Sequence, residues 1–125
     1  MIFYSVGKRV KDFVKVVLNP AALKHRENKS KSGGETKRII HKYPNGKIKG
    51  ELYYKNGNLN GISTLYYENG SIKSRENYKD GVLDGLAKYY YESGRIMREE
   101  FYRNGNLLFK RVFNLDGTVN SETKY

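Results

Sequence analysis

The sequence predicts a mainly β protein: a single-layer antiparallel meander of β-hairpin repeats with a short N-terminal amphipathic helix. Three observations predict this fold. Turn dipeptides of the Asn-Gly type recur along the chain, the distances between them repeat, and tyrosines lie at fixed positions beside them. A fixed sequence period of about 20–50 residues is typical of repeat proteins.

The turn dipeptides divide the chain into strands of two alternating lengths. Successive glycines of these dipeptides are 11, 13, 11, 13, 11 and 12 residues apart, so two unequal strands form a unit of 24 residues. Asn-Gly and Asp-Gly between apolar residues indicate two-residue hairpin turns, because both turn residues need a positive φ. The dipeptides are Asn45-Gly46, Asn56-Gly57, Asn69-Gly70, Asp80-Gly81, Ser93-Gly94, Asn104-Gly105 and Asp116-Gly117.

A two-residue turn at each dipeptide fixes which residues face each other across a hairpin. Counting two positions outward gives six pairs, and each places a tyrosine opposite an aliphatic residue. Such pairs stabilise a sheet by roughly 0.2–1 kcal/mol each relative to alanine pairs. The seventh pair is Asn114–Val119 and the gap before it is short, so we expect the array to decay or bulge there. The six pairs are Tyr43–Ile48, Tyr54–Leu59, Tyr67–Ile72, Tyr78–Leu83, Tyr91–Ile96 and Tyr102–Leu107.

Alternation along the strands predicts two faces of different character. One face carries large residues near the strand ends and small residues in the middle. The reverse face is more polar but still carries tyrosines. If this reverse face binds a partner, tyrosine is a residue type enriched among binding anchors. The expected contact residues are then Tyr53, Tyr66, Tyr90 and Lys88. The alternative is that these side chains only cover the face, with rings stacked on the stems of Lys and Arg.

The motif Y-Y-x-N-G-x-I-x-S/R, followed by Y-K-D/N-G-x-L-D/N-G, resembles the MORN repeat family in its bacterial variant form, the YwqK-like antitoxin type. The resemblance covers about residues 37–120. Phe109 stands where the last unit should have its second glycine, which is typical of a terminal, capping repeat. The residues that fill the motif are Tyr43, Gly46, Gly57, Leu59 and Gly61, then Tyr67, Gly70, Gly81, Leu83, Gly85 and Tyr90, then Tyr91, Gly94, Gly105 and Leu107.

The resemblance implies a non-enzymatic protein-binding module. Its antitoxin type implies an immunity-like protein that binds and occludes a partner protein, here a cognate toxin. MORN proteins are also linked to membranes, so a membrane-associated scaffold is the alternative. Inhibitors of toxins that attack nucleic acids are expected to be acidic, whereas this chain is basic. Either the partner is acidic, or the sheet binds it and the basic arm has another role.

Residues 1–20 are expected to hold the amphipathic helix, because apolar residues recur at helical spacing from Gly7 to Leu18. This helix would either cover an edge of the sheet or lie on an anionic membrane. In the second case, the contact residues would be Lys8, Arg9, Lys11 and Lys15. Residues 21–35 are predicted to be a basic flexible linker, and residues 36–125 the repeat sheet.

The positive charge is concentrated in the N-terminal part. The net charge is +10 over residues 1–50 and +1 over residues 51–125. Such an arm suits an anionic lipid surface, an acidic partner or nucleic acid, or it serves as solubilising surface. Nucleic-acid binding through the arm is the second alternative function, and it is disfavoured because the sheet register already explains the tyrosine positions.

No motif in the sequence indicates catalysis. There is no cysteine, and the two histidines, His25 and His41, have no metal-site spacing. Glu99 and Glu100 are adjacent and hence lie on opposite faces of a strand. We therefore expect no enzyme activity, cofactor or metal. Without a secretory or membrane-spanning segment, the expected location is cytoplasmic, or peripheral at the inner face of the membrane. A homodimer through an open sheet edge is a further option.

Overall fold

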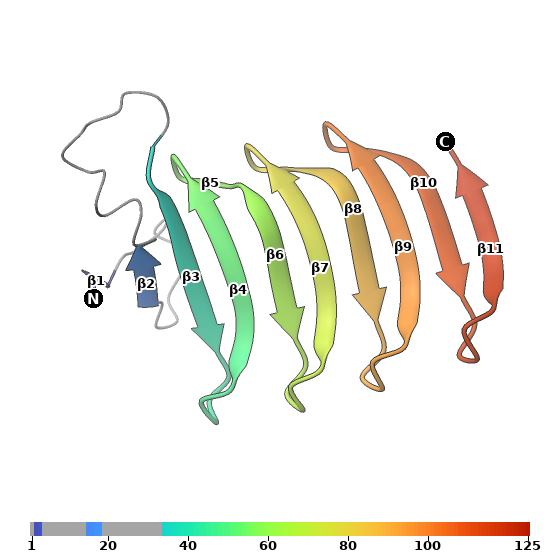
Figure 1. The fold of residues 1–125 in the computed structure, drawn as a ribbon, viewed down its shortest axis with the longest axis horizontal. Coiled ribbons are helices and arrows are strands. Elements are labelled where there is room, and N and C mark those ends of the chain that lie inside the picture. The colour runs from blue at the N-terminus through green and yellow to red at the C-terminus, as the bar shows by residue number, and fades with distance from the viewer. Residues whose placement is uncertain (1, 4–14, 19–33) are drawn as a thin grey trace.

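The structure is a computed structural model that describes residues 2–3, 15–18 and 34–125. These residues form one antiparallel sheet of 11 strands, in which the strands follow one another across the sheet in chain order (Figure 1). The prediction of a mainly β antiparallel meander is confirmed for them. The strands are β1 (Ile2–Phe3), β2 (Lys15–Leu18), β3 (Thr36–Lys42), β4 (Ile48–Lys55), β5 (Asn58–Leu59), β6 (Gly61–Tyr66), β7 (Ile72–Lys79), β8 (Val82–Tyr90), β9 (Ile96–Arg103), β10 (Asn106–Phe113) and β11 (Val119–Lys124).

The expected N-terminal helix falls mostly on residues 4–14, which lie outside the described residues, as does most of the linker expected over 21–35. Helix and linker therefore stay predictions there. The last four residues of the expected helix, Lys15–Leu18, are strand β2 instead, paired with β3. The helix prediction as a whole is not tested. Val16 and Val17 are β-branched and favour a strand, and the pairing covers an edge of β3.

Three of the six predicted tyrosine pairs are confirmed, and all three lie at one end of the strands. Tyr54 pairs with Leu59, Tyr78 with Leu83 and Tyr102 with Leu107. The turns between them contain two residues, both with positive φ. The first turn residue has a φ of 53° at Asn56, 48° at Asp80 and 49° at Asn104. This backbone is the one that Asn-Gly and Asp-Gly favour.

The pairs predicted at the opposite end of the strands are wrong by one residue. Ile48 pairs with Lys42, Ile72 with Tyr66, Ile96 with Tyr90 and Val119 with Phe113.

The four turns at this end share one hydrogen-bond pattern, and only the first of them, at residues 43–47, contains a proline. The loop of this first turn has three residues, with Gly46 N donating to Tyr43 O at 2.9 Å and Tyr43 N donating to Lys47 O at 2.8 Å. A two-residue turn would need an N–H from the residue before Asn45, and Pro44 has none. Proline instead suits the first central position of a type I turn, with the glycine following in the left-handed conformation.

A bulge near the start of each long strand accounts for the alternation of 11 and 13 residues between successive turn glycines. Between the Tyr78–Leu83 and Glu76–Ala87 pairs, β8 has two more residues than β7, and Gly85 within them has a φ of 113°. In β10 the corresponding stretch has only one extra residue, and Phe109 takes the glycine's place. A side chain is rarely tolerated at this φ. The bulge expected in the last unit is therefore confirmed.

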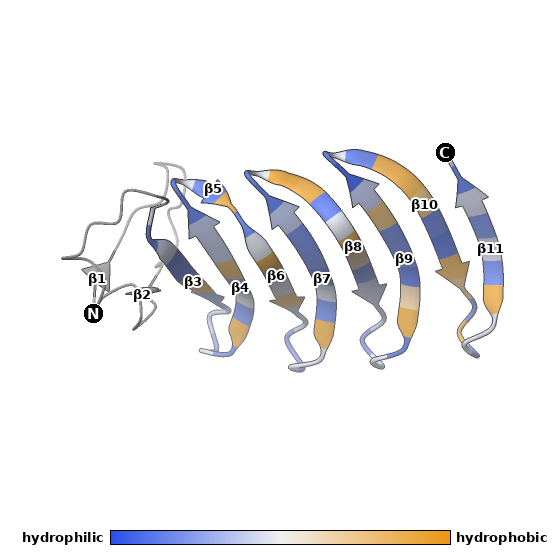
Figure 2. Ribbon diagram, turned by 45° about the horizontal axis from the view of Figure 1, so that its top comes forward, coloured by the Kyte–Doolittle hydropathy of each residue, from blue (hydrophilic) through white to orange (hydrophobic). Residues whose placement is uncertain are grey.

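The sheet is a single layer, so its core is a narrow stripe on one side, which we call the first face. The six buried residues of the described chain all lie there. Most are small, which lets tyrosines close over them. Gly50 shows how close this packing is, because an added Cβ would lie 2.8 Å from Leu65 Cδ2. Apolar residues gather near the turns at the strand ends (Figure 2). The buried residues are Ile39, Gly50, Ser63, Ser74, Ala87 and Glu100.

Candidate interaction surface

The opposite side of the sheet, which we call the second face, carries a row of polar side chains in register across neighbouring strands. Each member lies directly opposite the next in the strand pairing, so the row crosses the sheet at right angles to the strands. We call it the charged row. Its members are Glu51, Thr64, Arg75, Lys88, Glu99, Arg111 and Glu122, in order from β4 to β11.

Most charges of this row are paired. Arg38 Nε donates to Glu51 Oε1 at 2.9 Å, and this contact is the main reason that the pKa of Glu51 is lower than usual. Glu99 lies 3.5 Å from both Lys88 Nζ and Arg111 Nη1. Pairs of this kind at a partly exposed surface stabilise a protein by only about 0–1 kcal/mol. They fix the positions of the side chains more than they stabilise the sheet.

Arg75 is the exception in the charged row. Its side chain is exposed, and it makes no ion pair with any residue that the structure describes. Directly opposite it lies Lys88, another cation. Like charges opposite each other destabilise a sheet. The centre of the second face therefore carries positive charge that the fold itself does not neutralise.

Beside the charged row runs a second line of residues, four of them apolar and three of these exposed, which we call the apolar row. Leu86 and Phe101 are direct cross-strand neighbours, and Phe101 faces Phe109. Ile62 is 52% exposed, Leu86 40% and Phe101 37%. Asn77 lies opposite Ile62 and donates to Leu86 O at 3.2 Å, which joins the two halves of the row. The members are Ile62, Asn77, Leu86, Phe101 and Phe109.

The structure places all four predicted contact residues on the second face, and all are half-buried. Tyr66 donates to Glu51 Oε2 at 3.0 Å, and Tyr53 interacts with Arg38. Lys88 pairs with Glu99. The hydroxyl of Tyr90 has no hydrogen-bond partner among the residues that the structure describes.

Sequence reasoning missed Arg75 and the apolar row as candidate contacts. The available signal was the alternation itself, since Leu86 lies two residues from Lys88 and therefore on the same face.

Three of the four candidate contacts for an anionic surface fall on residues that the structure does not describe, so this prediction is not tested. Lys8, Arg9 and Lys11 lie outside the described residues, and Lys15 is the first residue of β2, where it pairs with Ile40. Within the parts of the chain described, no helix is long and apolar enough to cross a membrane.

The first face holds a cluster of tyrosines and glutamates that satisfy one another. Tyr78 donates to Glu76 Oε2 at 2.6 Å, and Tyr102 donates to Glu100 Oε2 at 3.0 Å. Arg98 Nε donates to the other oxygen of Glu100 at 2.9 Å. Burial, followed by the nearby glutamates, raises the pKa of Tyr78 and Tyr102. Each glutamate accepts a hydrogen bond from a tyrosine of its own strand, and β8, which carries Ala87, lies between them.

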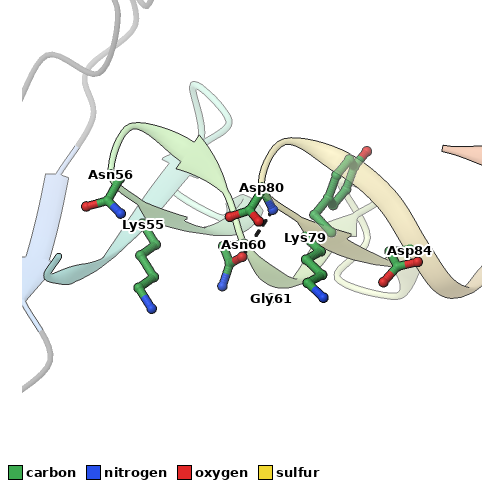
Figure 3. Close-up of a pocket in the computed structure, with 8 residues that line it drawn as sticks. Lys55, Asn56, Asn60, Gly61, Lys79, Asp80 and Asp84 are labelled. Carbon is green, nitrogen blue, oxygen red and sulfur yellow. Dashed lines mark hydrogen bonds between the residues drawn. The ribbon is translucent and has the colours of Figure 1, made fainter. Parts of the chain in front are cut away.

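A hollow of about 590 Å³ lies at the end of the sheet with the two-residue turns (Figure 3). Its polar groups connect successive repeats: Asp80 N donates to Asn60 Oδ1 at 3.2 Å, and Gly81 N to Leu59 O at 2.8 Å. One repeat later, Asn104 N donates to Asp84 Oδ1 at 3.0 Å. The described residues contain no group of three or more metal-ligating side chains. The hollow is lined by Lys55, Asn56, Asn60, Gly61, Tyr78, Lys79, Asp80 and Asp84.

Comparison with known families agrees with the repeat boundaries seen in the structure. The sequence profile of the family described as MORN repeat variant matches three consecutive segments, residues 38–56, 59–80 and 83–104, which together make up just over half of the chain. The segments lie within the range of about residues 37–120 that the motif indicated. The last hairpin, with its irregular bulge at Phe109, is not matched. No curated protein matches the chain.

Proposed function

Because the chain belongs to the MORN repeat variant family, we propose that it is a non-enzymatic, cytoplasmic protein-binding module of the antitoxin or immunity type. It would act by covering a functional surface of its partner. MORN repeats are generally associated with protein or membrane binding. The observation that carries the proposal is the apolar row on the second face, which runs beside the charged row and its Arg75, an arginine that makes no ion pair with the described residues.

The composition of the second face supports this proposal. Exposed apolar residues scattered singly are normal on any protein, whereas neighbouring ones such as Leu86 and Phe101 are typical of interaction sites. Interfaces are enriched in Tyr, Phe and Arg. The second face carries all three types: tyrosines beside the rows, Phe101 and Phe109 in the apolar row, and Arg75 in the charged row. The side chains are held on regular strands, so a partner would meet a surface that is already ordered and would have little conformational entropy to remove.

The charges of the second face favour a partner that is acidic at its centre. Arg75 has no counterion among the described residues, and it faces Lys88. A carboxylate placed between the two would remove their repulsion and form a charge-assisted hydrogen bond with the guanidinium. This arrangement is consistent with a basic chain acting on an acidic surface, and it does not require the N-terminal arm.

The test is affinity capture from a lysate of the native host, using the full-length chain and three variants. Leu86→Asp places a charge in the apolar row. Val82→Asp places the same charge at another exposed apolar position of β8, which is 46% exposed and lies beside the turn. The third variant replaces Lys8, Arg9 and Lys11 with Gln. We expect one stoichiometric protein to be retained by the wild type, by Val82→Asp and by the arm variant, and to be lost with Leu86→Asp.

Retention of that protein by Leu86→Asp and its loss with the arm variant would contradict binding through the second face. The membrane-associated scaffold is the alternative, favoured by the positive charge in the arm. It predicts sedimentation with anionic phosphatidylserine vesicles that the arm variant abolishes, without any captured protein. Retention of RNA or DNA by the wild type but not by the arm variant would favour the second alternative, nucleic-acid binding.

A further inference from the structure

The last strand of the sheet, β11, has a neighbour on one side only. It pairs with β10, and no other strand among the described residues lies beside its outer edge (Figure 1). All six of its residues are exposed. Proteins commonly protect such an edge with a proline or with charges that repel a second strand. The stretch from Val119 to Lys124 has no proline, and its two charges have opposite signs.

The hydrogen bonds within the sheet show which backbone groups of β11 point outward. Tyr125 N donates to Leu108 O at 3.0 Å, so the backbone of Tyr125 faces β10. In an antiparallel pair, the direction of N–H and C=O alternates from residue to residue. Thr123, paired with Lys110, therefore also faces β10. The outward-facing N–H and C=O groups belong to Glu122 and Lys124.

Only a few registers allow two copies of β11 to pair with twofold symmetry. The outward groups must meet, so the hydrogen-bonded pairs have to be made from Glu122 and Lys124. Pairing Glu122 with itself places two carboxylates opposite each other, and pairing Lys124 with itself places two ammonium groups opposite each other. Both arrangements are unfavourable. Pairing Glu122 with Lys124 forms two opposite-charge pairs at once, because the symmetry repeats the contact.

We propose that two copies of this chain associate through β11 in this register, with Thr123 on the twofold axis, and thereby form one continuous antiparallel sheet. Glu122 then lies between two cations, Arg111 of its own chain and Lys124 of the second copy. Within one chain, Arg111 Nε is already 2.5 Å from Glu122 Oε2. The alternation of the charged row from Lys88 through Glu99, Arg111 and Glu122 continues across the edge into the second copy.

Charge reversal tests both the pairing and its register. Lys124→Glu leaves the Arg111–Glu122 pair intact and places a second carboxylate opposite Glu122 of the other copy. Glu122→Lys places two lysines opposite each other. We expect each single variant to raise the dimer dissociation constant about ten-fold, measured by sedimentation equilibrium. The double variant Glu122→Lys with Lys124→Glu restores two opposite-charge pairs between the copies but still lacks the Arg111–Glu122 pair, so we expect it to dissociate less readily than either single variant without fully reaching the wild type.

Two further variants make the result decisive. Lys79→Glu reverses an exposed lysine of β7, far from β11 in the sheet, and should leave the dissociation constant unchanged. Lys124→Pro removes an outward N–H that no described strand of its own chain uses, and should favour the monomer without lowering the melting temperature. A wild-type chain that is monomeric at every concentration would overturn the proposal. So would a dimer that ignores the single reversals, or a double variant that stays as weak as either single one.

Discussion

Arg75 and Lys88 lie directly opposite each other on β7 and β8, at the centre of the second face. Lys88 is offset by Glu99 at 3.5 Å, whereas Arg75 makes no ion pair with the described residues. A cation pair at this position costs folding free energy. Its presence on an exposed face is consistent with a role in binding, and this gives opposite expectations for stability and for affinity.

We expect Arg75→Gln to raise the free energy of unfolding by about 0.2–1 kcal/mol, because it removes the repulsion from Lys88. The same change should weaken binding of the captured partner, because the partner loses a charge-assisted hydrogen bond. Urea unfolding and titration calorimetry measure the two effects. Arg103→Gln, at an exposed position of β9 beside a turn, is the control for loss of an arginine. An affinity that Arg75→Gln leaves unchanged would show that this charge has no part in binding.

The tyrosines of the second face should separate into structural and binding residues. Tyr66 donates to Glu51, so Tyr66→Phe should lower the free energy of unfolding by about 1 kcal/mol. Tyr90 makes no hydrogen bond with the described residues, so Tyr90→Phe should change stability by less than about 0.5 kcal/mol. Tyr90→Ala should weaken partner binding more than it lowers the melting temperature. Equal losses of both would make Tyr90 a structural residue.

The sequence predicts the strand order and the period of this sheet because the turn chemistry is local. Asn56-Gly57 specifies its own positive-φ turn, and the Tyr54–Leu59 pair follows from it. At the other end of the strands the same dipeptides occur inside a longer loop, and the pairs move by one residue. Pro44 was a warning at the first of these turns alone, since it cannot supply the N–H that a two-residue turn needs.

The candidate surface was only partly predictable. Alternation places Tyr66, Lys88 and Tyr90 on one face, and the structure agrees. Alternation within a strand does not show which charges form ion pairs. Glu51 pairs with Arg38 and Glu99 with Arg111, and in both cases the partner lies on a neighbouring strand whose register has to be known. The lack of a partner for Arg75 therefore became visible only with the neighbouring strands in place.

The bulge glycines should tolerate a side chain poorly. Gly85 has a φ of 113°, and an added Cβ would lie 3.3 Å from Asn77 Cβ. We expect Gly85→Ala to lower the free energy of unfolding by more than about 1 kcal/mol, measured by urea denaturation. Gly94→Ala is the matched control: its φ is 91°, but its Cβ would meet nothing within 4 Å, so only backbone strain remains. A smaller loss at Gly85 than at Gly94 would contradict this account of the bulge.

The tyrosines of the first face should make the protein sensitive to alkali. Burial, and then Glu76 and Glu100, raise the pKa of Tyr89 from its ordinary value of 10.0 to about 12. Between these values the folded chain holds a proton that the unfolded chain has released, so this contribution to stability is complete below about pH 10 and is lost as the pH rises toward 12. Urea unfolding from pH 8 upward should therefore show a falling free energy above about pH 10. Tyr89→Phe should make that fall less steep, whereas Tyr125→Phe, which removes an exposed hydroxyl, is the matched control. An equally steep fall in the Tyr89→Phe variant would show that this ring does not couple folding to pH.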